Sequence, residues 1–199
     1  NWHKGRTRYC VWMYRLDDEA ITQKLTHLAA AISTALGTAP IHHFHVTLFA
    51  SGFLSTSLRY NDDITPDTID RQIDAAKVLP HTQPRLVMTG LEANAYGIFI
   101  TLEDQSATTD QIRSTLAHIS GEVPRDSFMP HITLGSYLQA HPLAQVQAIL
   151  KTLPVPDFPL PIPHCHLELV TLDATTPLRP DIGLCRDNFT TLYNAQYLQ

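Results

Sequence analysis

The sequence carries the same four-residue pattern twice, each time within a stretch that is typical of a β-strand. The two copies are HVTL at 45–48 and HITL at 131–134. The apolar residues that precede them also match, because Val11 lies 34 residues before the first histidine and Ile98 lies 33 residues before the second. Repetition on this scale predicts two copies of one structural unit, packed about a pseudo-two-fold axis.

The apolar pattern predicts the order strand, helix, strand, helix, strand in each half of the chain. The six expected strands cover 8–16, 43–50, 85–91, 96–102, 128–137 and 166–172. The four expected helices start at residue types that are favoured at helix N-termini, near positions 18, 66, 109 and 142. Gly37 is expected to end the first helix. Residues 51–63 are polar and are expected to form a long loop that the second half lacks.

These elements predict an α+β fold with two lobes, in which antiparallel-rich sheets line a central groove and the helices lie outside. We expect one domain over residues 1–199, with lobes at about 8–92 and 96–173 and a C-terminal segment at 174–199. Because 44% of the 199 residues are hydrophobic, the chain can bury a core without disulfides or a structural metal. Intrinsically disordered, collagen-like and coiled-coil classes are therefore excluded.

Charge and cysteine content limit the expected partners and compartment. The 14 basic and 19 acidic residues give a net charge of −5, which argues against long duplex nucleic acid because its binding depends on neutralising phosphates. A small nucleotide or an RNA terminus held at one local site is compatible with this charge. No apolar run is long enough to span a bilayer, so no membrane partner is expected. Three cysteines favour a reducing compartment such as the cytoplasm, and we expect no secretory signal and a monomer.

Strand geometry predicts that the histidine and threonine of each motif share one face. Side chains alternate along a strand, so His45 and Thr47 point one way while the aliphatic residues beside them enter the core. His131 and Thr133 follow the same rule in the second copy. Two imidazoles across a groove suit general acid–base catalysis, and two hydroxyls can hold the oxygens of a phosphate. This set fits metal-independent hydrolysis of a cyclic phosphodiester, whereas a non-catalytic nucleotide-binding protein would not need both imidazoles.

The paired motifs resemble those of the 2H phosphoesterase superfamily, whose members carry two H-x-[TS]-x motifs in a bilobal α+β fold. The resemblance extends from about Tyr9 to Leu172. Within the superfamily, the layout is similar to that of plant and fungal-type cyclic nucleotide phosphodiesterases. This similarity rests on CVW at 10–12, FMPHITL at 128–134, and a late strand followed by Cys185 and TTLYN.

The resemblance implies hydrolysis of a 2′,3′-cyclic phosphate, or of ADP-ribose 1″,2″-cyclic phosphate, to a phosphomonoester. It implies four catalytic residues, His45, Thr47, His131 and Thr133. Cleavage of a linear linkage, as in 2′-5′ oligoadenylate or at an RNA 3′ end, by the same residues is the enzymatic alternative. The loop at 51–63 departs from the family layout, and we expect it to cover the groove and change the range of substrates.

Five further residues are candidates for binding the substrate. Aligning Val11 with Ile98 makes Trp12 and Phe99 equivalent and predicts that both face the groove, where an aromatic ring can stack on a base. Tyr137 and Ser136 come at the end of the second motif strand and are candidates to contact the phosphate. His43 shares a face with His45, where it can tune the pKa of that histidine or bind phosphate.

Two histidine pairs and a basic cluster are not expected to form further functional sites. The HFH at 43–45 and the HCH at 164–166 have the spacing of two ligands on one strand face, but neither has a supporting carboxylate or second cysteine. We therefore expect no metal site and no cofactor. The basic cluster of Lys4, Arg6 and Arg8 is interpreted as a solvated tail.

Overall fold

The computed structural model describes residues 2–41, 43–79, 82–123, 128–175 and 189–195. Over these residues the protein is α+β, with a single sheet and four helices. The helices are α1 (Glu19–Leu36), α2 (Pro66–Lys77), α3 (Thr108–Ala117) and α4 (Leu143–Leu150). The strands are β1 (Arg8–Leu16), β2 (Thr38–Pro40), β3 (His45–Leu54), β4 (Asp63–Ile64), β5 (Leu86–Ala93), β6 (Gly97–Asp104), β7 (His131–Tyr137), β8 (Leu160–Pro161), β9 (Cys165–Asp173) and β10 (Phe189–Ala195).

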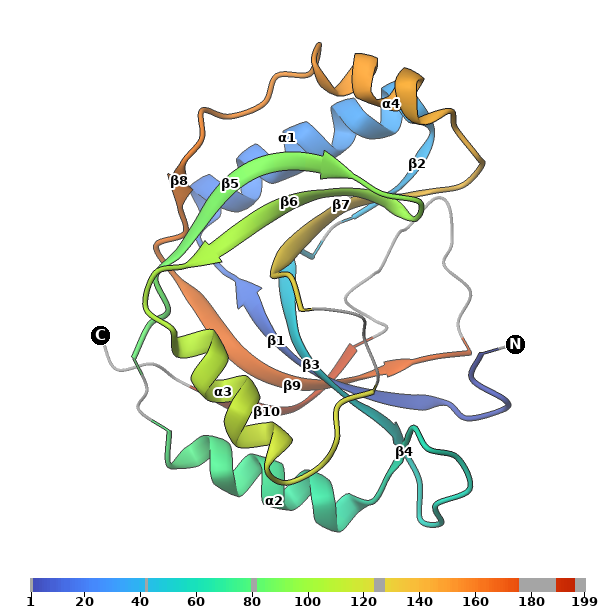
Figure 1. The fold of residues 1–199 in the computed structure, drawn as a ribbon, viewed down its shortest axis with the longest axis vertical. Helices are drawn as coiled ribbons and strands as arrows, with labels where there is room; N and C mark the ends of the chain where they lie inside the picture. Colours follow the sequence, from blue (N-terminus) through green and yellow to red (C-terminus); the bar gives the residue numbers. More distant parts are fainter. Residues whose placement is uncertain (1, 42, 80–81, 124–127, 176–188, 196–199) are drawn as a thin grey trace.

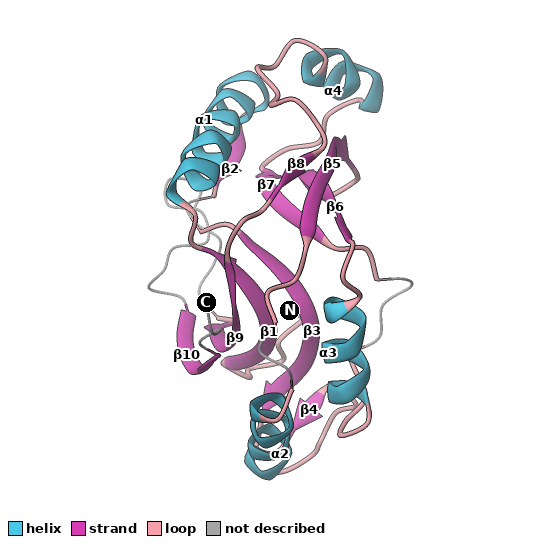
Figure 2. Cartoon of the chain, turned by 90° about the vertical axis from the view of Figure 1, so that its left-hand side faces the viewer, coloured by secondary structure: helices cyan, strands magenta, loops and turns pink. Residues whose placement is uncertain are grey.

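The sheet has the strand order β10-β9-β1-β3-β7-β6-β5-β8, with β2 added to β7 and β4 added to β3. Neighbouring strands are antiparallel except for β3 and β4. Figure 1 shows the sheet curving strongly, with α2 and α3 at one end and α1 and α4 at the other. The perpendicular view shows the same two pairs of helices outside the sheet (Figure 2). This is the expected bilobal α+β architecture.

Each lobe takes elements from both halves of the sequence. We call β1, β3, β9, β10, α2 and α3 the first lobe, and β5, β6, β7, α1 and α4 the second lobe. The reason is the hairpin between β5 and β6, whose turn is closed by the Asn94 amide donating to the Gly97 carbonyl at 3.0 Å. So short a connection makes the two strands pair with each other. β5 therefore belongs to the second lobe, although its sequence lies in the first half of the chain. The edge of β1 that does not pair with β3 pairs instead with β9 from the second half.

The ends of α1 follow the local signals in the sequence. The Asp18 side chain accepts a hydrogen bond from the Ile21 amide and caps the N-terminus, and Gly37 ends the helix in the left-handed region with φ of 61°. Other boundaries differ from expectation. β3 begins at His45 and runs on to Leu54, so the first residues of the expected loop at 51–63 are strand. The predicted strand at 128–137 begins only at His131.

The rest of the stretch at 51–63 folds back against β3. The Phe53 amide donates to the Asp62 carbonyl at 2.7 Å. Gly52 is required at this close approach, because its φ is 117° and a Cβ there would lie 2.4 Å from the Asp62 carbonyl oxygen. The loop therefore lies beside the strand, and among the described residues none from 55–63 lines a pocket at His45. The expectation that this loop covers the groove is wrong.

Most of the buried apolar side chains form one cluster that contains the aliphatic residues of both motifs. Cys10 and Cys165 are free thiols in buried positions, and Cys185 lies outside the described residues. No helix within the described ranges is long and apolar enough to cross a membrane.

Candidate active site

The two motifs meet where the lobes join. β3 and β7 pair antiparallel at Val46 and Ile132, which are the second residues of the two motifs (Figure 1). Both side chains are fully buried and belong to the core. The pair therefore lies at the centre of the pseudo-two-fold arrangement that the repeat predicts.

The polar residues of the motifs surround this central pair. In an antiparallel pair the neighbours on either side also face each other, so His45 lies across from Thr133 and Thr47 lies across from His131. All four side chains are half-buried, while the residues between them are buried. The expected alternation is thus present, and two imidazoles and two hydroxyls share one face of the sheet. No hydrogen bond to either threonine hydroxyl is found within the described part of the chain.

Each motif strand carries a β-bulge directly after its threonine. In the first lobe Thr47 pairs with Met13 but Phe49 pairs with Trp12, which leaves Leu48 as the extra residue. In the second lobe the corresponding extra residue is Leu134, because Thr133 pairs with Phe99 and Gly135 pairs with Ile98. The two lobes therefore share an irregularity as well as a motif.

The bulges make Met13 equivalent to Phe99 and Trp12 equivalent to Ile98. The prediction that Trp12 faces the groove is therefore wrong. Its side chain is fully buried on the opposite face, where Nε1 donates to Gln72 Oε1 at 2.9 Å. The cause is a one-residue slip in the sequence alignment, because Trp12 and Ile98 each lie 33 residues before a motif histidine. A slip of one residue moves a strand side chain to the other face.

Both motif histidines contact an aromatic ring on the groove face. Phe99 lies there as predicted, with its ring centre 5.3 Å from that of His131. Phe189 of β10 makes the corresponding contact with His45 at 5.9 Å. Sequence reasoning missed Phe189 because β10 was not among the expected strands.

Backbone carbonyls orient both imidazoles in the same way. Nδ1 of His45 lies 3.1 Å from the His43 carbonyl oxygen, and Nδ1 of His131 lies 2.8 Å from the Met129 carbonyl oxygen. A carbonyl oxygen can only accept, so Nδ1 carries the proton in each ring. Nε2 is therefore the atom that each histidine has available to exchange a proton with a substrate.

The pKa of His45 lies below that of a free histidine. Burial lowers it, and the positive charges that His131 and His43 carry when protonated lower it further. The hydrogen bond to the His43 carbonyl acts in the opposite direction. The neutral form of His45 is thus favoured at neutral pH, as a general base requires.

His43 and Ser136 lie at the groove, although neither side chain forms part of the central set of four. His43 and His45 line a narrow pocket of about 90 Å³ with Phe189. Ser136 pairs with Gly97, one residue beyond the bulge, and is half-buried. The equivalent residue of the first lobe, Ala50, lines the same pocket as His45 and Thr47, which places Ser136 on the groove face.

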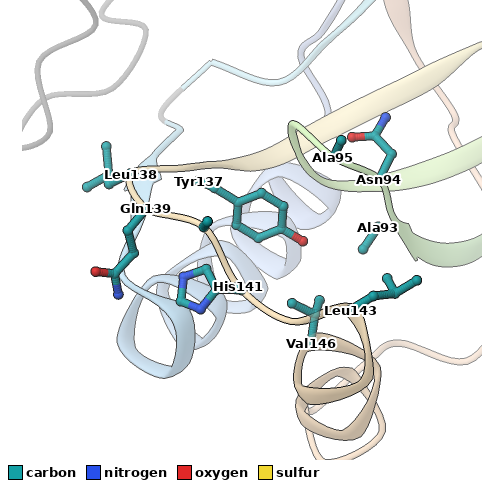
Figure 3. Close-up of a pocket in the computed structure, with 10 residues that line it drawn as sticks. Ala93, Asn94, Ala95, Tyr137, Leu138, Gln139, His141, Leu143 and Val146 are labelled. Atoms are coloured by element: carbon teal, nitrogen blue, oxygen red, sulfur yellow. The ribbon is translucent and has the colours of Figure 1, made fainter.

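Tyr137 lies on the other face of the sheet, so its predicted place in the groove is wrong. The bulge gives the groove position to Ser136 and turns the next residue toward the core. Figure 3 shows the Tyr137 ring beside His141. Both residues line a separate cavity of about 620 Å³, between the β5–β6 turn and α4. Burial raises the pKa of Tyr137, so its phenol stays protonated at neutral pH.

A second pocket, of about 350 Å³, adjoins His45 and Thr47 on the first lobe. It is lined by Trp2, Tyr9, Val11, Met13, His45, Thr47, Ala50, Val123 and Leu172. Arg15, which pairs with His45 across β1 and β3, lines the narrow pocket on the other side of His45. Its guanidinium is held by Asp17 at 2.8 Å and by the buried Glu168 at 3.0 Å. Every second residue of β1 lines one of these two pockets, namely Tyr9, Val11, Met13 and Arg15. This alternation in the sequence could have identified them if the register of β1 had been known.

The two histidine pairs that have the spacing of metal ligands, at 43–45 and 164–166, have other surroundings. His166 Nε2 lies 2.7 Å from Asp17 Oδ2, an ion pair when the histidine is protonated. Over the described ranges, no group of three or more His, Cys, Asp or Glu side chains is placed to hold a metal ion.

Comparison with known proteins finds no matching family model and no matching curated protein. Two solved structures of E. coli LigT are similar to this chain in fold. The structure of LigT in complex with 3′-AMP has a TM-score of 0.62 at 16% identity and covers 97% of this chain and 99% of LigT. The structure of LigT in its apo form has a TM-score of 0.56 at 17% identity, with coverage of 96% and 98%. The chain has the fold of LigT.

Proposed function

We propose that this protein is a metal-independent phosphodiesterase of the 2H phosphoesterase superfamily that hydrolyses a 2′,3′-cyclic phosphate to a phosphomonoester. The observation that carries the proposal is the arrangement of two His-x-Thr motifs about the Val46–Ile132 pair, each with Nδ1 of its histidine bound to a backbone carbonyl. The fold shared with LigT supports it, because one LigT structure holds 3′-AMP, a phosphomonoester of the kind that this reaction releases.

The surroundings of the two histidines suggest their roles. His45, whose neutral form is favoured, takes a proton from water at Nε2 while the water oxygen forms a bond to phosphorus. The bond from phosphorus to one ribose oxygen breaks, and that oxygen receives a proton from Nε2 of His131, which enters this step as the imidazolium with both ring nitrogens protonated. The hydroxyls of Thr47 and Thr133 donate to the non-bridging oxygens, where negative charge builds up.

The same four residues can act on a linear linkage, because the chemistry at phosphorus needs only a base, an acid and donors to the oxygens. A plant or fungal-type cyclic nucleotide phosphodiesterase and a 2′-5′ oligonucleotide phosphodiesterase would thus share this centre. What distinguishes them is the surface around the groove.

The direct test is incubation with 2′,3′-cyclic AMP in the presence of EDTA, with the product separated as 2′-AMP or 3′-AMP. Turnover is expected, and His45→Ala and His131→Ala should each lower kcat by about 10²–10⁴-fold, the usual contribution of a general acid or base. His27→Ala is the matched control, because His27 is exposed on α1.

Two outcomes would refute the proposal. If His45→Ala or His131→Ala turned over the substrate at a rate near that of the wild type, that histidine would not be the proposed base or acid. Tight binding of the nucleotide without turnover would make the protein a nucleotide-binding protein that keeps the fold but not the activity.

A further inference from the structure

The pocket at His45 and Thr47 extends away from the motifs along the groove face of β1. Its floor is formed by Met13, Val11 and Tyr9, which alternate along the strand, and Trp2 lies at its far end. Met13 is paired with Thr47, whereas Tyr9 is four residues further along β1, about 13 Å at the rise of a strand. The groove thus leads from the candidate catalytic centre to the N-terminal segment of the described chain.

An aromatic cluster lies at the end of this groove. The ring centre of Trp2 is 5.2 Å from that of Tyr9 and 5.0 Å from that of Phe53, and the last two rings are 4.8 Å apart. Trp2 is nonetheless 57% exposed, while Phe53 is fully buried beneath it. An indole that is supported from one side and open on the other can stack a planar ring.

Arg6 fixes the segment that carries Trp2. Its guanidinium binds Asp62 at 2.5 Å and Asp63 at 2.6 Å, and it lies 3.8 Å from the centre of the Phe53 ring. The same guanidinium donates to the carbonyl oxygens of His3 at 2.9 Å and Trp2 at 3.4 Å. The N-terminal segment is therefore bound to the loop beside β3, and Trp2 is held in place before any ligand arrives.

Basic charge is present next to the aromatic cluster. Arg6 is neutralised by its two aspartates, but Lys4 is exposed, with Nζ 4.3 Å from the centre of the Tyr60 ring. The described residues include no carboxylate within ion-pair distance of Lys4. Aromatic rings interleaved with cations are typical of surfaces that bind single-stranded nucleic acid. In the basic cluster, which the sequence predicts to be a solvated tail, Arg6 is instead bound to the loop beside β3.

We propose that Trp2 and Tyr9 form a base-stacking subsite for the penultimate nucleotide, the one before the nucleotide that carries the reacting phosphate, so that the substrate is a single-stranded RNA end. The inference rests on the proposed function, which places the reacting phosphate between the motifs. Only a ribose separates that phosphate from its own base, which then lies over Met13 and Val11. The next base back along the strand then reaches the Trp2 ring.

The proposal predicts a preference that a mononucleotide enzyme would lack. We expect the kcat/KM of a dinucleotide that ends in a 2′,3′-cyclic phosphate to exceed that of 2′,3′-cyclic AMP by about tenfold, within the range of stacking one base on an aromatic side chain. Trp2→Ala should remove this difference through KM, with kcat for the dinucleotide little changed. Tyr96→Ala is the control, because Tyr96 is also an exposed aromatic residue, at 84%, but lies on the β5–β6 turn.

Tryptophan fluorescence tests the subsite without catalysis. The chain has two tryptophans, and Trp12 is fully buried, so quenching by an added trinucleotide with a 3′-phosphate reports on Trp2. Quenching that is absent in Trp2→Phe but present in His131→Ala supports the subsite, even if no cyclic phosphate is turned over and the proposed function fails. Equal kcat/KM for the two substrates, or turnover of the dinucleotide with no quenching, would overturn it.

Discussion

His45 and its neighbours determine how activity depends on pH. The proposed base must be neutral, and its pKa lies below the usual value of about 6.5 because of burial and the charges of His131 and His43. As pH falls through this lowered pKa, His45 takes up a proton and can no longer accept one from water. We therefore expect kcat/KM to fall on the acid side with a midpoint below about 6.5.

The effect of the His131 charge on the pKa of His45 can be measured directly. His131→Gln removes a nearby positive charge, so the pKa of His45 should rise toward that of a free histidine, as measured by NMR titration of the ring. Because burial, the largest cause, is unchanged, the recovery should be partial. A His45 that titrates at or above the value of a free histidine in the wild type would contradict this account.

Strand pairing and β-bulges determine which residues reach the groove. A substitution at Gly97 tests the pairing of β6 and β7 next to the second bulge. A Cβ on Gly97, which pairs with Ser136, would lie 2.3 Å from the carbonyl oxygen of Gly135, the residue that follows the bulge at Leu134. Because backbone cannot yield as a flexible side chain can, we expect Gly97→Ala to lower the free energy of unfolding by about 1–3 kcal/mol, the usual cost of overpacking. Urea denaturation measures this effect. Gly121→Ala, where a Cβ meets nothing within 4 Å, should leave the midpoint nearly unchanged.

The elements that could be predicted from sequence are those with strong local signals. β1 occupies the predicted 8–16, and α1 begins and ends at the residues that cap it, Asp18 and Gly37. Short strands such as β2, β4 and β8 exist only because a partner strand lies beside them, which no local pattern reveals. The four motif residues could be selected because the repeat marks them.

The face of the sheet on which each possible substrate-binding residue lies is harder to predict, because a β-bulge leaves no clear sign in the sequence. The spacing in the sequence aligns Trp12 one residue out of register, and the position of Tyr137 at the strand end predicts for it the groove face that Ser136 occupies. Both errors arise at the bulges that follow Thr47 and Thr133. Phe189 and Trp2 reach the groove through pairing and packing between segments far apart in the chain, which alternation within one strand cannot show.

At the scale of the whole molecule, the exchange of strands makes the two lobes depend on each other. β1 pairs along its full length with β9, and β5 pairs with β6, so each half of the sequence leaves strand edges without partners when it is alone. The aliphatic residues of both motifs also share one core cluster. We therefore expect that neither repeat unit folds by itself.

This dependence predicts the behaviour of the chain when it is cut in the exposed turn between β5 and β6. Fragments 1–95 and 96–199, expressed separately, should each lack a cooperative unfolding transition by circular dichroism, because each loses the strand that completes its sheet. Mixed in equal amounts, they should recover the transition and, with both motifs again joined at Val46 and Ile132, activity toward a 2′,3′-cyclic phosphate. A fragment that unfolds cooperatively by itself would show instead that one repeat suffices for a folded lobe.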